Sequence, residues 1–137
     1  FDSGYQSLSG FNESFKNIID FVQEKLLEQN EPSVFKDKPQ CFYRSPTGLK
    51  CGIGFLISNN LYAKYYNKNI EGVAASHLPE EILKSIQCTF NVIDKNYDDF
   101  LELLIRIQNV HDASLNSDLP FKNHIVKGFN DLKLQYK

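Results

Sequence analysis

The stretch that most constrains the fold is residues 41–57, which hold two of the three cysteines and three of the seven glycines of the chain. At its centre, Ser45-Pro46-Thr47-Gly48 is a turn sequence, because Pro fixes φ at the second position and Gly relieves strain at the end. The flanking segments, Cys41–Arg44 and Leu49–Cys51, predict two short strands. The stretch therefore predicts a β-hairpin. The apolar run that follows, as far as Ile57, fits either a continued strand or a short buried helix.

Apolar residues at helical spacing dominate the rest of the chain. The first stripe predicts a helix over about Asn12–Gln29, with Pro32 just beyond its end. Pro79 and the two glutamates after it mark the start of a second helix. The most apolar stripe predicts a buried central helix over Asp98–His111, and another amphipathic stripe predicts a last helix over about Pro120–Leu134.

These elements predict a fold of the α+β class that is predominantly helical, with four or five helices packed around one short β-hairpin. The length of 137 residues suits one domain. We expect a single globular domain over residues 11–137. Residues 1–10 are rich in Ser and Gly and are predicted to be a flexible arm.

The charge balance excludes some partners. The formal net charge is −2 and the chain has no basic excess, so a nucleic-acid partner is not expected. No apolar run approaches the roughly 20 residues of a membrane span, so we expect a soluble protein without a membrane partner. The odd number of cysteines and the lack of a signal-peptide pattern favour a reducing cytosol. The chain begins at Phe1, which leaves a removed leader or a trimmed chain open.

Cys51, His111 and Asp112 are the candidates for nucleophilic catalysis. A helix that began after Cys51 would lower the pKa of the thiol, and His111 could act as its base. Against this, adjacent His and Asp residues on a helix point in different directions, and a buried cysteine often serves as a small hydrophobe. No catalytic residue is therefore predicted, and this set is kept as the alternative.

Cys41, Cys51 and His111, with or without Cys88, are the candidates for a metal site. Zinc sites usually contain cysteines two to four residues apart, whereas nine residues separate Cys41 from Cys51. Opposite positions of a hairpin would still bring the two thiols close, free or as a disulfide. Simple packing of free thiols is favoured, and neither a metal nor another cofactor is predicted.

A cluster of cations and tyrosines is the predicted ligand site. Its members are Tyr43, Arg44, Lys50, Tyr62 and Tyr66, with Tyr65 beside them. The planar fork of an arginine suits phosphate or carboxylate groups, and tyrosine rings offer stacking surfaces. Such a set predicts a nucleotide-like or acidic ligand, or a protein surface. The competing interpretation is an arginine paired with a nearby glutamate among half-exposed tyrosines.

Several short motifs follow one another in a definite order. They are Cys41-x-Tyr43-Arg44, Gly48-Leu49-Lys50-Cys51, Gly54-x-Leu56-Ile57, a Tyr at 62 or 66, Ile70-Glu71-Gly72 and Gln108-x-x-His111-Asp112. This order resembles an uncharacterised family of small proteins common in bacteria and their phages. The resemblance covers about residues 11–134, and it implies a phage or bacterial cytosolic origin. Two positions depart from the family pattern: Gly52 stands where Ala is frequent and Ser58 where Pro is frequent.

These observations together predict a small non-enzymatic binding protein of phage or mobile-element type, in the cytoplasm of the bacterial host. It would hold a protein partner or a small anionic ligand. The concrete form that we expect is inhibition or sequestration of a host defence component. The alternative is a thiol-dependent enzyme that uses Cys51 with His111.

Overall fold

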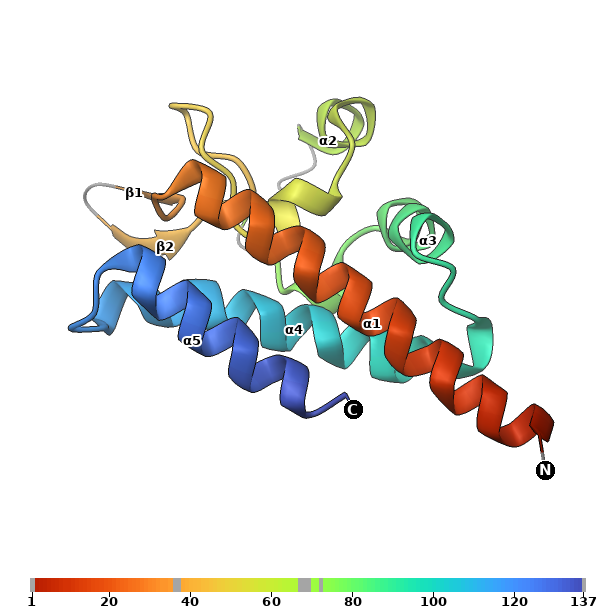
Figure 1. Ribbon diagram of the computed structural model, residues 1–137. Helices are drawn as coiled ribbons and strands as arrows, with labels where there is room; N and C mark the ends of the chain where they lie inside the picture. The colour runs from red at the N-terminus through yellow and green to blue at the C-terminus, as the bar shows by residue number, and fades with distance from the viewer. Residues whose placement is uncertain (1, 36–37, 67–69, 72, 137) are drawn as a thin grey trace.

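The computed structural model describes residues 2–35, 38–66, 70–71 and 73–136 (Figure 1). The described residues form five α-helices: α1 (Asp2–Gln29), α2 (Asn59–Tyr65), α3 (Glu80–Thr89), α4 (Tyr97–Ala113) and α5 (Phe121–Leu134). Short 3-10 helices connect them: η1 (Ile53–Leu56), η3 (Ala75–His77), η4 (Asp94–Asn96) and η5 (Ser114–Asn116). Two short strands, β1 (Val34–Phe35) and β2 (Lys38–Cys41), pair antiparallel.

Helix α1 has the apolar stripe that its sequence predicts, and the buried side chains of that stripe are Phe15, Ile18, Ile19, Val22 and Leu26. The predicted C-terminal end at Gln29 is confirmed. Asn30 stops the helix, because it adopts a left-handed conformation with φ of 57° and donates its N–H to the Leu26 carbonyl at 2.8 Å. The predicted start at about Asn12 is wrong, because the helix begins at Asp2 and residues 2–10 of the predicted arm lie in its first turns. The flexibility of that arm and the domain boundary stay predictions.

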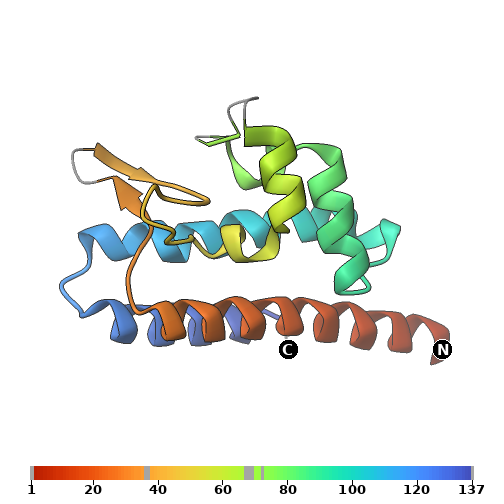
Figure 2. The ribbon, with the colours of Figure 1, turned by 90° about the horizontal axis from the view of Figure 1, so that it is seen from above.

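Helix α4 is the centre of the molecule, as its sequence predicts. Its residues Phe100, Leu103, Leu104 and Ile107 are fully buried. In Figure 2, α1 and α5 lie side by side in one layer, and α4 lies between them and the smaller elements α2, α3, β1 and β2. The predicted starts of α3 and α5 are also confirmed, with Pro79 and Pro120 at their N-caps. Helix α2 was not predicted, although Ser58 caps it by accepting the Leu61 N–H at 3.2 Å.

The predicted α+β class is wrong, and so is the predicted β-hairpin over residues 41–57. Helices build the fold of the described residues. The strands β1 and β2 are only two and four residues long, and β2 ends at Cys41, the first residue of that stretch. The chain does turn at Ser45–Leu49, but across the turn the described backbone forms only one isolated bridge, Arg44 with Lys50, and a bond from the Cys51 N–H to the Phe42 carbonyl at 3.3 Å. The short run that was left open between strand and helix is the 3-10 helix η1.

Side chains from distant elements explain why no strand ladder forms here. Both backbone groups of Lys50 bond to the Gln29 side chain, with the N–H donating to Oε1 at 2.9 Å and the carbonyl accepting from Nε2 at 2.8 Å. The N–H groups of Tyr43 and Arg44 donate to the carboxylate of Glu71. Glu71 thus takes the Tyr43 N–H, which a ladder would pair with Cys51. The Arg44 N–H and both backbone groups of Lys50 face away from the partner segment and are taken by Glu71 and Gln29, so no further strand adds there.

Within the ranges that the structure describes, no helix combines the length and the apolar character needed to cross a membrane.

Candidate functional site

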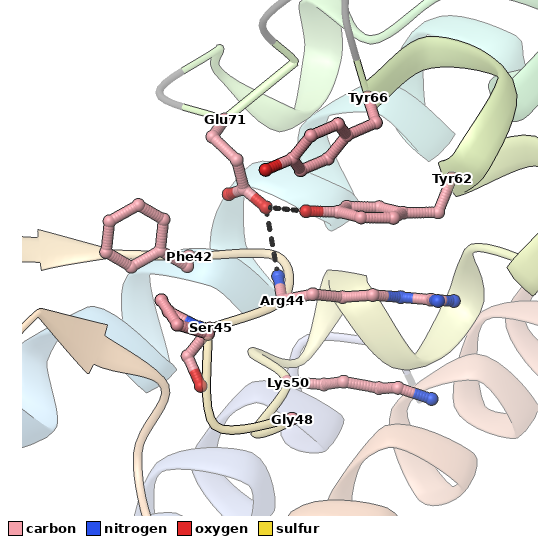
Figure 3. Close-up of a pocket in the computed structure, with 9 residues that line it drawn as sticks. Phe42, Arg44, Ser45, Gly48, Lys50, Tyr62, Tyr66 and Glu71 are labelled. Atoms are coloured by element: carbon pink, nitrogen blue, oxygen red, sulfur yellow. Dashed lines mark hydrogen bonds between the residues drawn. The ribbon is translucent and has the colours of Figure 1, made fainter.

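A pocket of about 600 Å³ lies beside the turn that follows β2 (Figure 3). Its walls come from the loop between β2 and η1, from α2 and from the segment after α2. The lining residues are Phe42, Arg44, Ser45, Pro46, Gly48, Lys50, Tyr62, Tyr66 and Glu71. The site therefore combines two cations, one carboxylate and three aromatic rings.

The turn brings the two cations together. The Ser45 N–H donates to the Leu49 carbonyl at 2.7 Å, and the Gly48 N–H donates to the Ser45 carbonyl at 3.0 Å. Gly48 adopts φ of +90°, a conformation that favours glycine. Because Arg44 and Lys50 are paired opposite each other, their side chains leave the same face. Figure 3 shows the two side chains extended alongside one another.

Glu71 holds the pocket wall together. Its Oε1 accepts the Tyr43 N–H at 2.7 Å, and its Oε2 accepts the Arg44 N–H at 3.1 Å and the Tyr62 hydroxyl at 2.6 Å. These three bonds tie α2 to the loop after β2. They also fix the Tyr62 ring over the Arg44 guanidinium, whose central carbon lies 4.5 Å from the ring centroid. Burial, followed by the bond to Glu71, raises the pKa of Tyr62, so its hydroxyl stays a donor.

Arg44 has more donors than partners. Its Nη2 donates to the Ile57 carbonyl at 2.8 Å. Its Nε–H is buried and has no hydrogen-bond partner among the described residues, and the guanidinium forms no ion pair with a carboxylate of that part of the chain. Burial lowers the pKa of Arg44, although Tyr62 and Glu71 act in the opposite direction. A buried unpaired donor raises the free energy of the protein unless something else occupies it.

Lys50, beside Arg44, is a second cation without an ion-pair partner among the described residues. Its Nζ lies 5.6 Å from the centroid of the Phe55 ring and, within the described residues, forms no ion pair. Burial lowers the pKa of Lys50, and the charges of Arg44 and Lys25 lower it further. Two neighbouring cations therefore raise the electrostatic cost of each other's charge.

Four of the five predicted ligand residues line this pocket: Arg44, Lys50, Tyr62 and Tyr66. The fifth, Tyr43, lies in the core with 2% exposure, and its hydroxyl donates to the Val73 carbonyl. Tyr65 faces another way and donates its hydroxyl to Glu81 at 2.8 Å. Glu71 was missed, although it belongs to the Ile-Glu-Gly motif. The competing interpretation, an arginine paired with a nearby glutamate, is not found among the described residues, because Glu71 accepts the backbone N–H of Arg44 and not its guanidinium.

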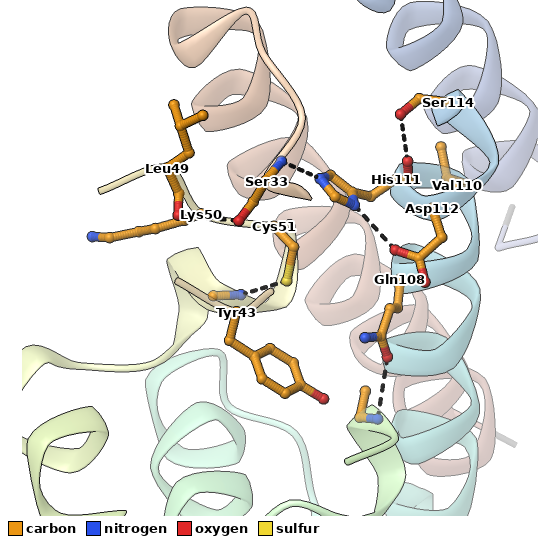
Figure 4. Close-up of polar contacts among 12 residues, drawn as sticks. Ser33, Tyr43, Leu49, Lys50, Cys51, Gln108, Val110, His111, Asp112 and Ser114 are labelled. Carbon is orange, nitrogen blue, oxygen red and sulfur yellow. Dashed lines mark hydrogen bonds and ion pairs between the residues drawn. The ribbon is translucent and has the colours of Figure 1, made fainter. Parts of the chain in front are cut away.

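His111 and Asp112 lie close together, but their geometry suits structure rather than catalysis (Figure 4). The Nε2 of His111 accepts the Ser33 N–H at 3.1 Å, and its Nδ1 lies 3.1 Å from Oδ1 of Asp112. Since a backbone N–H can only donate, the proton of the neutral ring sits on Nδ1 and bonds to Asp112. The nitrogen that a general base would use is therefore occupied by Ser33, which also donates its hydroxyl to the Leu49 carbonyl at 3.2 Å.

Cys51 lies fully buried next to η1. Its Sγ accepts the Gly54 N–H at 3.4 Å, and burial raises the pKa of the thiol to about 12. The helix that follows it is a 3-10 helix of four residues, too short to offset the loss of hydration. The thiol is therefore protonated and shielded at neutral pH.

We expect Cys51 to resist alkylation in the folded protein, because only an exposed thiolate reacts quickly. Iodoacetamide at pH 7.5, followed by peptide mass spectrometry, should label the exposed Cys88 in the native protein. Cys51 should be labelled only when denaturant is added. Labelling of Cys51 as fast as Cys88 in the native protein would contradict its structural role.

Metal ligation finds no support in the described part of the chain, where no group of three or more His, Cys, Asp or Glu side chains is placed to hold an ion. Cys51 and Cys88 are free thiols, one buried and one exposed. The side chain of Cys41 lies outside the described residues, so the predicted proximity of Cys41 and Cys51 stays a prediction.

Comparison with known proteins does not assign this chain to a family. No protein-family model matches the chain, and neither a curated protein nor a solved structure matches it. The function therefore has to be inferred from the residues of the pocket.

Proposed function

We propose that this protein is a small non-enzymatic binding protein that holds a small anionic ligand between Arg44 and Lys50. One observation carries the proposal: two adjacent, partly buried cations have no carboxylate partner among the described residues. Neighbouring like charges destabilise the empty protein, and the buried, unpaired Nε–H of Arg44 adds to that cost. An anion bound to both side chains would offset each of these terms with charge-assisted hydrogen bonds.

Glu71 does not take the place of such a ligand. It is the one carboxylate among the lining residues. Its oxygens already accept two backbone N–H groups and the Tyr62 hydroxyl. In Figure 3 the guanidinium of Arg44 extends away from this carboxylate. The pocket thus keeps a net positive charge at the ends of the two cationic side chains, which supports an anionic ligand.

The lining of the pocket supports binding without catalysis. None of the lining residues is a histidine or a cysteine. The Ser45 hydroxyl accepts the Leu49 N–H at 3.0 Å and lies 3.0 Å from the Thr47 hydroxyl, so no base is positioned to activate it. The alternative of a thiol-dependent enzyme is disfavoured, because Cys51 is buried and the Nε2 of His111 is bonded to Ser33.

The biological setting in this proposal rests on the sequence motif alone. The resemblance to small bacterial and phage proteins suggests a phage or mobile-element origin and a place in the host cytoplasm. A protein that only binds can act by sequestration, and inhibition of a host defence component through capture of its anionic ligand fits a pocket without catalytic groups.

Replacing Lys50 with Gln tests the proposal. Isothermal titration at low ionic strength would use phosphate, pyrophosphate, citrate, AMP and ATP as probes. We expect at least one of them to bind, and Lys50→Gln to weaken that binding about tenfold, because a hydrogen bond to a charged group contributes about 1.5–3 kcal/mol. The free energy of unfolding should change by no more than about 0.5 kcal/mol, since a repulsion is removed together with the charge.

Lys84 provides the matched control. Like Lys50 it lies over an aromatic ring, with its Nζ 4.9 Å from the centroid of Tyr97, but it belongs to α3 and pairs with Asp94 at 3.8 Å. Lys84→Gln should leave the affinity for every probe unchanged. The proposal is wrong if no probe binds the wild-type protein, or if the Lys50 and Lys84 variants bind equally well.

A further inference from the structure

We infer that the ligand is a nucleoside monophosphate, with its phosphate at Arg44 and Lys50 and its base on the exposed ring of Tyr66. This inference rests on the proposed function and names the class of its ligand. The pocket has a cationic part, formed by Arg44 and Lys50, and an aromatic part. The aromatic part consists of Phe42, Tyr62 and Tyr66.

The aromatic part continues directly from the guanidinium. One face of the Tyr62 ring covers Arg44, and the Tyr66 ring follows at a centroid distance of 5.9 Å, tilted by 54°. Figure 3 shows this order, with Lys50, Arg44, Tyr62 and Tyr66 one above the other. Tyr66 is 61% exposed, so much of its ring is accessible to a ligand. A planar base would find a stacking surface here within reach of the bound phosphate.

The size of the pocket favours a ligand larger than a simple anion. Its volume of about 600 Å³ falls within the range of small-molecule sites, roughly 300–1,000 Å³. Inorganic phosphate would fill only a small part of it. The wall at Gly48 has no side chain, and a Cβ built there would meet no atom within 4 Å, so that edge of the pocket stays open.

The charge of the pocket favours one phosphate over three. Two cations face one carboxylate among the lining residues. A phosphate monoester carries about −1.5 to −2 charges at pH 7, which the two cations can match. A triphosphate would bring further charges, and the lining holds no third cation to neutralise them. We therefore expect AMP to bind with a higher affinity than ATP.

The test compares AMP, adenosine and inorganic phosphate by isothermal titration on the full chain. We expect AMP to bind at least tenfold more tightly than phosphate, and adenosine to bind more weakly than AMP. Tyr66→Ala should lower the affinity for AMP about tenfold and leave the affinity for phosphate unchanged. Tyr66→Phe, which keeps the ring, should bind AMP as the wild type does.

Tyr65→Ala is the control, because Tyr65 is the neighbouring ring on α2 but its hydroxyl bonds to Glu81 outside the pocket. It should not change AMP binding. Phosphate or citrate binding as tightly as AMP, or a Tyr66→Ala variant that keeps full AMP affinity, would overturn the nucleotide inference while the anion pocket stands. If none of the anions binds, the proposed function fails together with it.

Discussion

Replacing Arg44 with Gln should lower the affinity for the anionic ligand by about 100-fold, the largest functional effect that we expect in this protein. The guanidinium is the only group of the pocket that can offer a planar fork of donors to a phosphate or carboxylate. Two charge-assisted hydrogen bonds at about 1.5 kcal/mol each account for a change of this size. The fold should survive, because the lost bond to the Ile57 carbonyl is offset by removal of the buried unpaired Nε–H.

Arg106→Gln is the matched control for this prediction. The chain has two arginines, and Arg106 lies on α4, where it bonds to Glu102 at 2.7 Å and to the Gln135 side chain. Both variants are titrated with the anionic ligand, and circular dichroism verifies that they are folded. We expect Arg106→Gln to bind as the wild type does. A folded Arg44→Gln protein that binds as the wild type does would exclude the pocket as the anion site.

Gly54→Ala should destabilise the protein by about 3 kcal/mol, the largest effect on stability that we expect. A Cβ at this position would lie 1.9 Å from the carbonyl oxygen of Tyr43, which is backbone and cannot rotate away. Either η1 or the segment before the turn would have to move. Because a typical domain is stable by only 5–15 kcal/mol, the shift should be obvious in urea unfolding. Arg44 follows Tyr43 directly, so the pocket should also lose affinity.

Gly48→Ala is the control substitution for Gly54→Ala. A Cβ at Gly48 meets no atom within 4 Å, so the substitution costs only the strain of a φ of +90° in a residue with a side chain. We expect a loss of about 1–2 kcal/mol, smaller than that at Gly54. Equal stability of the Gly54 variant and the wild type would mean that η1 does not approach Tyr43 as closely as described.

Helices α1, α3, α4 and α5 were predictable because their apolar stripes are local signals. The stripe over Asp98–His111 identified both α4 and its burial, and Pro79 and Pro120 marked the starts of α3 and α5. The end of α1 could be predicted for the same reason, because the residues after Gln29 cannot continue a helix. In each case residues close in sequence decide the structure.

The absence of the hairpin could not be predicted in this way, because strand pairing at this turn depends on residues far away in the sequence. The turn at Ser45–Leu49 is local and forms. The pairing around it does not extend, since Glu71 takes the Tyr43 N–H that a ladder would pair with Cys51, and Gln29 takes both outward-facing backbone groups of Lys50. Nothing in residues 41–57 themselves indicates these two partners.

The site was predictable where residue type is informative. Arg44, Lys50, Tyr62 and Tyr66 were expected from their chemistry, and the turn brings the two cations together. Tyr43 has the same side chain as Tyr62, but that side chain is buried in the core and does not line the pocket.

The most direct test of the anion pocket is a ¹H–¹⁵N NMR titration that follows the Nε–H signals of the two arginines. The Arg44 Nε–H has no partner among the described residues, whereas Arg106 lies outside the pocket and serves as an internal reference. We predict that AMP, and more weakly phosphate, shifts the Arg44 signal in a saturable way and leaves the Arg106 signal in place. A titration in which neither signal moves, or both move equally, would contradict a ligand bound at Arg44.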